Sequence, residues 1–253
     1  MTIRRGLAAM AIVLLASGSR HARATDCVVL LHGLARTARS MAPLAEAFAA
    51  RGYKVANIDY PSRDAVVEVL AARAVNAGLA QCRAHRASRV HVVTHSMGGI
   101  LLRHYLDRHT ITELGQVVML APPNHGSEIV DRLGSVPGFD LLLGPAGGQL
   151  GTGVEDLPAQ LGAPTYPVGI IAGTDTINPL LSRYLPDPDD GKVSLASTRL
   201  EGMVDFLAVP VSHPFIMRDE DVIRATVEFV ETGAFSHDSR PEAPGPPRLP
   251  GAN

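Results

Sequence analysis

The chain contains no tryptophan, and its 253 residues include only 6 phenylalanines and 5 tyrosines. So few aromatic rings argue against a ligand site built on aromatic stacking.

No basic run interrupts the sequence either. The formal net charge is −2, and it becomes −6 once the four arginines of the first 24 residues are set aside. A mildly acidic chain of this kind argues against nucleic acid as a partner.

No apolar stretch in the sequence is predicted to form a membrane-spanning helix. The stretch nearest the N-terminus, residues 6–15, is too short to cross a bilayer. It follows the basic pair Arg4-Arg5 and precedes Ala22-Arg23-Ala24, an A-x-A cleavage signature. This arrangement predicts a secretory signal peptide over residues 1–24, with export to the periplasm or the cell exterior. An uncleaved anchor is the alternative interpretation.

Cysteine is nearly absent, because the chain has only Cys27 and Cys82. In an exported protein, an even pair suggests a disulfide. Cys27 opens a predicted strand, and Cys82 ends a helix that leads into another strand at residues 90–93. If these two strands are neighbours, both cysteines lie at the same end of the sheet and can be joined. Two buried free thiols are the alternative.

Short apolar runs alternate with amphipathic segments along most of the chain. Strands are predicted at residues 27–31, 53–60, 90–93, 117–120, 168–172 and 206–211, and helices at 40–51, 64–85, 98–107 and 219–231. Ser40 is expected to cap the first helix and Gly52 to end it. Continuous Val, Ile and Leu strands separated by helices imply a mainly parallel sheet covered on both faces, an α/β fold. Functional residues are then expected beyond the carboxyl ends of the strands.

Two segments fall outside this alternation. Residues 126–167 contain no predicted strand, and their apolar stretch at 139–143 is interpreted either as a small lid or as a buried helix. Residues 236–253 are rich in proline and glycine without apolar periodicity, which predicts a disordered tail. The folded domain is therefore predicted to span residues 25–235, with 126–167 as its small lid region.

The most informative motif is the run VHVVTHSMGGILL at residues 90–102. It indicates a strand, a sharp turn and a helix, with Ser96 at the apex of the turn, where a serine is exposed as a nucleophile. The pattern is G-x-S-x-G, except that Thr94 replaces the first glycine, while Gly98 is retained. Small residues are expected on both sides of the serine because the helix and the strand pass close together there.

A nucleophilic serine needs a histidine base and a carboxylate that orients it. In strand–turn–helix enzymes the acid follows the serine in the chain and the histidine comes last. The histidines after Ser96 are His104, His109, His125, His213 and His237. His213 follows the last predicted strand, from which it can reach Ser96, and is therefore the predicted base. The residues alone leave two acids open, Asp175 and Asp190.

These motifs, with the turns Leu-His-Gly-Leu at residues 31–34 and Asp-Gly-Lys-Val at 190–193, resemble the α/β-hydrolase superfamily. Within it, residues 27–235 are most similar to the compact secreted bacterial lipases and esterases. In those enzymes the acid sits in an Asp-Gly-x-Val turn before the histidine, and Asp190 lies 23 positions before His213. The resemblance therefore favours Asp190 over Asp175. It also implies that the Leu34 amide joins the Met97 amide in an oxyanion hole.

Neither a metal nor a cofactor is expected. The sequence has no H-x-x-x-H pattern on a predicted helix, no cysteine pair at ligand spacing and no phosphate-binding glycine loop followed by a lysine. Arg103, His104 and His109 are interpreted as solvated residues of a surface helix. The aspartates at 187, 189 and 190 have calcium binding as an alternative role.

The sequence thus predicts an exported serine hydrolase, an esterase or lipase, that cleaves carboxylic esters through an acyl-enzyme intermediate. Its expected partner is a small-molecule ester or a lipid, with transient contact to a lipid interface. The same catalytic residues also serve acyltransferases and amide or thioester hydrolases, which are the alternatives within enzymes. A non-catalytic binding protein on a hydrolase scaffold is the alternative outside them.

Overall fold

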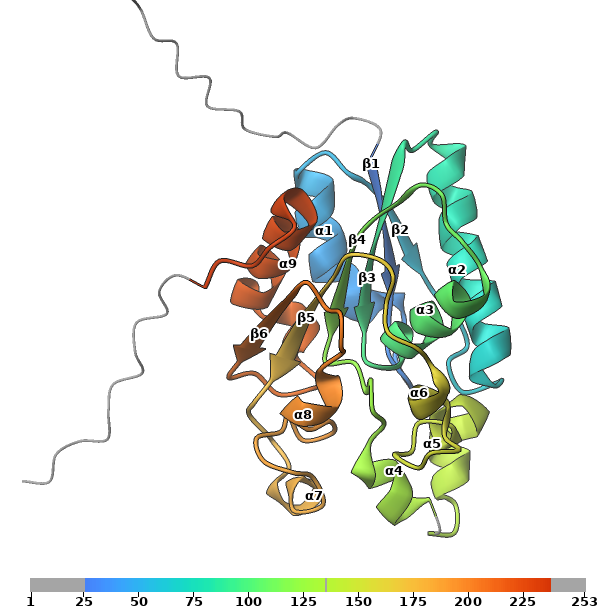
Figure 1. Cartoon of the computed structure of the whole chain (residues 1–253), viewed down its shortest axis with the longest axis vertical. Coiled ribbons are helices and arrows are strands. Elements are labelled where there is room, and N and C mark those ends of the chain that lie inside the picture. The colour runs from blue at the N-terminus through green and yellow to red at the C-terminus, as the bar shows by residue number, and fades with distance from the viewer. Residues whose placement is uncertain (1–25, 135, 238–253) are drawn as a thin grey trace, which may run out of the picture.

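The structure, a computed structural model, describes residues 26–134 and 136–237. The predicted signal peptide, residues 1–24, lies outside the described residues, as does the predicted tail from residue 238 onward (Figure 1). Within the described ranges, no helix combines the length and the apolar character that a membrane span requires.

The strands are β1 (Asp26–Leu31), β2 (Lys54–Ile58), β3 (Arg89–His95), β4 (Leu114–Leu120), β5 (Val168–Gly173) and β6 (Asp205–Val209). The longer helices are α1 (Ala42–Ala50), α2 (Val67–Ala84), α3 (Met97–Arg108), α5 (Phe139–Gly148) and α9 (Glu220–Thr232). Shorter helical segments are η1 (Ala38–Met41), α4 (Glu128–Leu133), α6 (Leu157–Gln160), α7 (Pro179–Ser182), α8 (Leu195–Thr198) and η2 (Ile216–Arg218).

The strands form one sheet in the order β2-β1-β3-β4-β5-β6, and every neighbouring pair is parallel. This confirms the predicted parallel α/β architecture. The chain runs from β1 outward to β2 and then crosses back to β3 on the other side of β1. In open parallel sheets, ligands bind in the crevice at such a reversal, outside the carboxyl ends of the strands.

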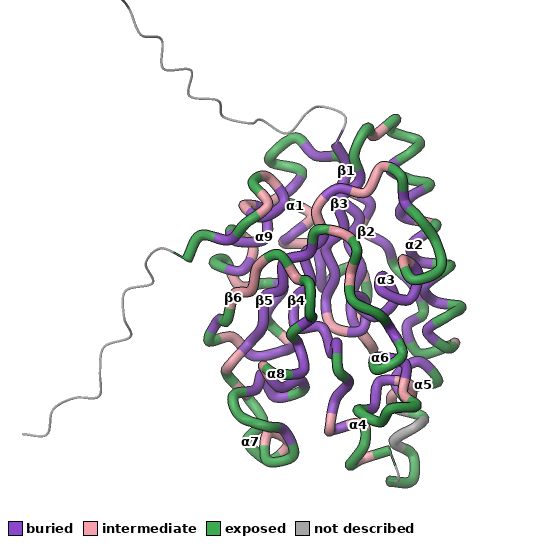
Figure 2. The backbone as a smooth tube through the Cα atoms, in the orientation of Figure 1, coloured by how far each residue is buried: buried purple, intermediate pink, exposed green. Residues whose placement is uncertain are grey.

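Helices cover both faces of the sheet (Figures 1 and 2). Along β1, Val28 and Leu30 belong to the apolar core beneath α1 and α9, whereas Val29 and Leu31 belong to the core beneath α2 and α3. Alternate residues of a strand point to opposite faces, so a strand covered on both sides must be apolar at every position. This is why central strands such as β1 and β5 appeared in the sequence as continuous apolar runs.

The first predicted helix starts differently from the expectation. Ser40 does not cap it, because it lies in the 3-10 turn η1, where its hydroxyl donates a hydrogen bond to the Thr37 carbonyl at 2.8 Å. Helix α1 begins after Met41, which provides no side-chain cap. The predicted end is correct: Gly52, with φ of +87°, follows the last turn. A left-handed residue of this kind terminates a helix, and glycine adopts it without strain.

Helix α3 is not the surface helix that was expected. Arg103 and His104 are both buried, at 5% exposure each, so the interpretation of these two residues as solvated is wrong. The Arg103 guanidinium donates hydrogen bonds to the carbonyls of Asn124 and Leu161, at 2.9 and 2.8 Å. These bonds satisfy a buried charge with backbone oxygens. They also join α3 to the connection after β4 and to the end of the 126–167 segment.

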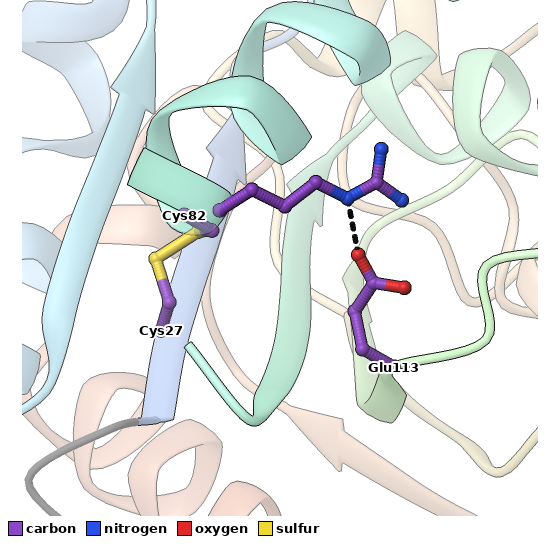
Figure 3. The surroundings of a disulfide bond; sticks show 4 residues. Cys27, Cys82 and Glu113 are labelled. Carbon is purple, nitrogen blue, oxygen red and sulfur yellow. Dashed lines mark hydrogen bonds and ion pairs between the residues drawn. A yellow bond between two sulfur atoms is a disulfide. The ribbon is translucent and has the colours of Figure 1, made fainter. Parts of the chain in front are cut away.

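The predicted disulfide is present, between Cys27 and Cys82 (Figure 3). β1 and β3 are neighbours, with Cys27 opposite Val90, so the condition on which the prediction depended is met. The bridge ties the start of β1 to the last turn of α2, and both cysteines are fully buried. Beside it, Arg83 forms an ion pair with Glu113 at 2.5 Å.

Removing this bridge is expected to destabilise the protein. The two cysteines are separated by 55 positions, and opening a loop of that size restores conformational freedom to the unfolded chain. We expect the Cys27→Ala/Cys82→Ala double variant to lose about 2–4 kcal/mol in free energy of unfolding. Urea denaturation of the variant and the oxidised wild type measures the difference. Equal free energies of unfolding would show that the bridge does not stabilise the fold.

Candidate active site

Ser96 occupies the sharp turn between β3 and α3. Its backbone has φ of 52° and ψ of −125°, a conformation that L residues rarely adopt. Such strain costs about 1–3 kcal/mol and persists only when the surrounding structure enforces it. Here the Ser96 amide donates to the Leu120 carbonyl at 2.8 Å, and the Ser96 carbonyl accepts from the Gly99 amide at 2.9 Å. The strand–turn–helix prediction is therefore correct in geometry.

The two motif positions on either side of Ser96, residues 94 and 98, differ in the room that they leave for a side chain. A β-carbon on Gly98 would lie 2.7 Å from the Leu31 carbonyl oxygen and 2.9 Å from that of His32. Position 94 is different, because Thr94 fits there fully buried. The departure from the glycine pattern at Thr94 is thus accommodated by the structure, whereas Gly98 is required by the approach of β1.

Replacing Gly98 by alanine is expected to displace the turn or β1. Overpacking of this kind costs about 1–3 kcal/mol in free energy of unfolding, and a displaced turn misplaces the Ser96 hydroxyl. We expect the thermal unfolding midpoint to fall. Gly148→Ala is the matched control, because nothing lies within 4 Å of an added β-carbon at that exposed helical position. Wild-type stability in Gly98→Ala would contradict the packing argument.

His213 follows β6 and faces Ser96. Its Nε2 lies 3.0 Å from the Ser96 Oγ, and its Nδ1 lies 2.7 Å from the Asp190 Oδ2. The carboxylate accepts a hydrogen bond from the Nδ1–H group, which leaves Nε2 free to accept the serine hydroxyl proton. The backbone strengthens this arrangement, because the His213 amide donates to the Asp190 carbonyl at 2.9 Å. Ser96, His213 and Asp190 therefore form one hydrogen-bonded chain.

Asp190, and not Asp175, lies beside His213. The other oxygen of the Asp190 carboxylate accepts from the amides of Lys192 and Val193, at 3.0 and 2.8 Å. Both oxygens are therefore occupied in a residue that is only 1% exposed. Asp175 is exposed, and its carboxylate accepts from the adjacent Thr176 amide at 2.8 Å.

The turn that carries Leu34 is held by Tyr60, which the sequence analysis did not single out. The His32 ring stacks on the Tyr60 ring with centroids 4.0 Å apart, and the Tyr60 hydroxyl donates to the His32 carbonyl. Burial lowers the pKa of His32, so the ring is neutral at pH 7. Neither the Leu34 amide nor the Met97 amide donates a hydrogen bond to another described residue. Both amides are thus available to an oxygen bound near Ser96.

His95 is a second residue that sequence reasoning missed. It is 2% exposed, and its Nε2 lies 3.2 Å from the carbonyl oxygen of His213. Burial, with smaller effects of His213 and Arg36, holds the pKa of His95 well below its usual range. A neutral His95 that donates from Nε2 anchors the His213 backbone. The motif gave no signal for this role, because its pattern leaves that position unspecified.

A cleft of about 290 Å³ opens beside Ser96 and His213. Much of its lining is apolar and comes from the 126–167 segment, through Ile129, Val130, Leu133, Leu143 and Leu150. The stretch at 139–143, interpreted as a lid or a buried helix, forms part of α5. Leu143 of this helix lines the cleft, whereas Leu141 is 81% exposed.

No cluster of potential metal ligands occurs among the described residues. The Asp189 carboxylate, one of the three oxygen groups considered for calcium, accepts hydrogen bonds from the Ser182 hydroxyl and the Gly191 amide. The second, Asp190, is used by His213, as described above. These aspartates therefore work within the protein as hydrogen-bond acceptors.

Several solved hydrolases share this architecture. The mature form of the lipase BlEst2 from Bacillus licheniformis is 21% identical, with a TM-score of 0.70 over 82% of this chain and 92% of that one. An esterase from Pyrococcus furiosus is 17% identical, with a TM-score of 0.59 over 82% of each chain. The phospholipase PlaB from Legionella pneumophila is 20% identical, with a TM-score of 0.56 over 75% of this chain and 53% of that one.

At sequence identities of 17–21%, the similarity to these three structures shows a shared fold. No curated protein sequence matches the chain significantly. The sequence profile of the alpha/beta hydrolase family matches residues 28–247, which is most of the chain. This match agrees with the parallel sheet, the strained serine turn and the place of the hydrogen-bonded histidine. The protein belongs to the alpha/beta hydrolase family.

Proposed function

We propose that this protein is an exported serine hydrolase that cleaves carboxylic esters. The observation that carries the proposal is the continuous hydrogen-bond chain from Asp190 through His213 to the Ser96 hydroxyl. Such a chain activates a hydroxyl that is otherwise a weak nucleophile at neutral pH. The disulfide is consistent with export, because such bridges persist in oxidising compartments.

In the first half of the reaction, Ser96 Oγ attacks the ester carbonyl carbon while His213 Nε2 takes the hydroxyl proton. Asp190 continues to accept the hydrogen bond from Nδ1–H and stabilises the imidazolium that forms, without taking the proton. The tetrahedral intermediate collapses, the carbon–oxygen bond to the alcohol breaks, and His213 returns the proton to the departing oxygen. In the second half, His213 activates a water that attacks the acyl-enzyme, which releases the acid and restores Ser96.

The negative oxygen of each tetrahedral intermediate accepts hydrogen bonds from the amides of Leu34 and Met97. Fixed backbone donors of this kind are worth about 10²- to 10³-fold in rate each. The donors are main-chain groups, so their side chains are not essential to the chemistry. The stacked pair His32 and Tyr60 keeps the first donor in place, as the contacts at that turn indicate.

The proposed folded unit is residues 25–235, with the leader removed after Ala24 and residues 126–167 acting as the small lid region. The apolar lining that this segment contributes suits the acyl part of an ester. Its exposed Leu141 is available for transient contact with a lipid interface. The substrate is accordingly a small-molecule ester or a lipid.

Hydrolysis of para-nitrophenyl esters from acetyl to palmitoyl tests this function. The protein that begins at Thr25 is expected to release para-nitrophenol, and the chain-length optimum separates an esterase from a lipase. Adding alcohols as competing acceptors measures how much acyl group goes to acceptors other than water. Failure to turn over any ester of the series would contradict the proposed function.

A further inference from the structure

The cleft carries two cations close to its catalytic residues. Arg36 follows the turn that holds Leu34, and Lys192 belongs to the same turn as Asp190; both residues line the cleft beside Ser96. None of the described residues that line it is acidic, although the whole chain has a formal net charge of −2. A positively charged cleft with apolar walls concentrates anions.

Neither cation has a carboxylate partner within ion-pair distance in the described part of the chain. The Arg36 guanidinium reaches the Pro214 carbonyl only at 3.5 Å. Part of Lys192 is exposed, and desolvation of the remainder, together with Arg36, lowers the pKa of its ammonium group. Arg36 repels the Lys192 ammonium group, and Asp190, whose carboxylate is bonded to His213, offsets part of this effect. A bound anion would relieve the remaining repulsion.

The opposite wall of the cleft is apolar. It is formed by α4, α5 and the residues after α5, through Leu133, Leu143 and Leu150. Figure 1 shows α4 and α5 beyond the carboxyl ends of the strands on one side, and α7 and α8 on the other. Lys192 belongs to the connection between α7 and α8. The cleft therefore offers different chemistry to the two parts of an ester.

The catalytic geometry indicates which part meets the cations. His213 returns its proton to the departing oxygen, so the alcohol part of the ester must lie next to His213. The Arg36 guanidinium contacts the carbonyl of Pro214, the residue after His213, and the Lys192 ammonium group is near enough to Arg36 and Asp190 for both to affect its pKa. Both cations thus lie on the alcohol side, while the apolar wall remains for the acyl chain.

We infer that Arg36 and Lys192 bind an anionic group, a carboxylate or a phosphate, on the alcohol part of the substrate. The inference rests on the proposed esterase function and specifies its substrate class. The enzyme then acts on esters that join an apolar carboxylic acid to an anionic alcohol. Cleavage gives an apolar acid and an anionic alcohol, the second of which leaves from the cationic side of the cleft.

A matched pair of esters tests the assignment. para-(Butanoyloxy)benzoate carries a carboxylate on the alcohol side, and para-(butanoyloxy)benzamide has nearly the same shape without the charge. We expect a higher kcat/KM for the anionic ester, with the ratio reduced about threefold to tenfold by Arg36→Gln or Lys192→Gln. Both rates come from one protein preparation, so the ratio cancels any loss of folded enzyme.

Lys54→Gln is the matched control. Lys54 is the chain's other lysine, and it is exposed at the amino end of β2, the edge of the sheet opposite the cleft. This variant is expected to keep the wild-type ratio. The preference of the wild type is also expected to decline as sodium chloride is raised, because salt screens partly exposed charges.

Two further arms complete the design. The butanoyl ester of para-hydroxyphenyl phosphate replaces the carboxylate by a phosphate and shows which anion is preferred. Mono-para-nitrophenyl adipate carries its charge on the acyl side, and para-nitrophenyl hexanoate is its uncharged counterpart. The ratio of kcat/KM between these two esters should be the same in the wild type, Arg36→Gln and Lys192→Gln. A ratio for the alcohol-side pair that is equal in wild type, Arg36→Gln and Lys192→Gln would overturn the inference.

Binding to the Ser96→Ala protein separates this inference from the proposed function. Calorimetry of para-(butanoyloxy)benzoate is expected to show binding that weakens when Lys192→Gln is added. Weakened binding supports the cationic site even if the wild type hydrolyses neither ester, a result that would refute only the esterase function. Binding of equal strength with and without Lys192 would refute the site.

Discussion

Replacing Ser96 by alanine is expected to reduce kcat for ester hydrolysis by roughly 10⁴- to 10⁶-fold. The reason is chemical: alanine has no oxygen to attack the carbonyl, so the acyl-enzyme cannot form. Only binding and the Leu34 and Met97 amides remain to assist attack by water, and these give a small residual rate over the uncatalysed reaction. Initial rates with a short para-nitrophenyl ester measure the effect.

The fold of this variant should be unchanged, because among the described residues the Ser96 hydroxyl hydrogen-bonds only to His213, at 3.0 Å. Equal thermal unfolding midpoints for the two proteins check this point. Ser236→Ala is a control with the same chemical change, since Ser236 is exposed and bonded to Glu228 at the end of the described chain. Activity in Ser96→Ala within tenfold of wild type would show that another group is the nucleophile.

Replacing Asp190 by asparagine is expected to lower kcat by roughly 10³- to 10⁴-fold. In asparagine, an NH2 group can take the place of the Asp190 Oδ2 atom. This group donates a hydrogen bond, so it no longer favours a proton on His213 Nδ1. The imidazole then takes the tautomer with the proton on Nε2, which cannot accept the Ser96 proton. Asparagine keeps an oxygen for the Lys192 and Val193 amides, which bond Asp190 Oδ1 at 3.0 and 2.8 Å, so the turn should survive.

Asp175→Asn is the matched control for the position of the acid. Asp175 is exposed and bonds its own neighbouring amide, so its neutralisation is expected to change kcat by no more than about twofold. Both variants are measured in the same assay, with thermal unfolding as a check on folding. A severe loss in Asp175→Asn with near wild-type activity in Asp190→Asn would assign the acid to Asp175.

The sheet could be predicted from the sequence because both of its faces are covered. Strands such as β1 and β5 are buried at every position and therefore appear as continuous apolar runs. Local capping was harder: Ser40 is a good capping residue by type, but the chain enters α1 through a 3-10 turn instead. Arg103 was misplaced because it is held through the Leu161 carbonyl of the 126–167 segment, which has no simple periodicity.

Some residues of the candidate site could be predicted from the sequence, and others could not. Ser96 and His213 could be found because their positions follow from local strand ends and chain order. Asp190 could be chosen over Asp175 only through the resemblance to known lipases and esterases. Its contact with His213 depends on how the connection after β5 folds back over Gly173. A β-carbon on Gly173 would lie 2.8 Å from that of Asp190. The roles of Tyr60 and His95 depend on contacts across the sheet, which no local pattern specifies.

The most direct test of the central claim is the site of covalent labelling by a fluorophosphonate, read by intact mass and peptide mapping. Fluorophosphonates react with serines that an adjacent base has activated. We expect one adduct per chain, on Ser96, and its loss in both His213→Ala and Ser96→Ala. An unlabelled protein, or an adduct on a different serine, would contradict the claim that Asp190 and His213 activate Ser96.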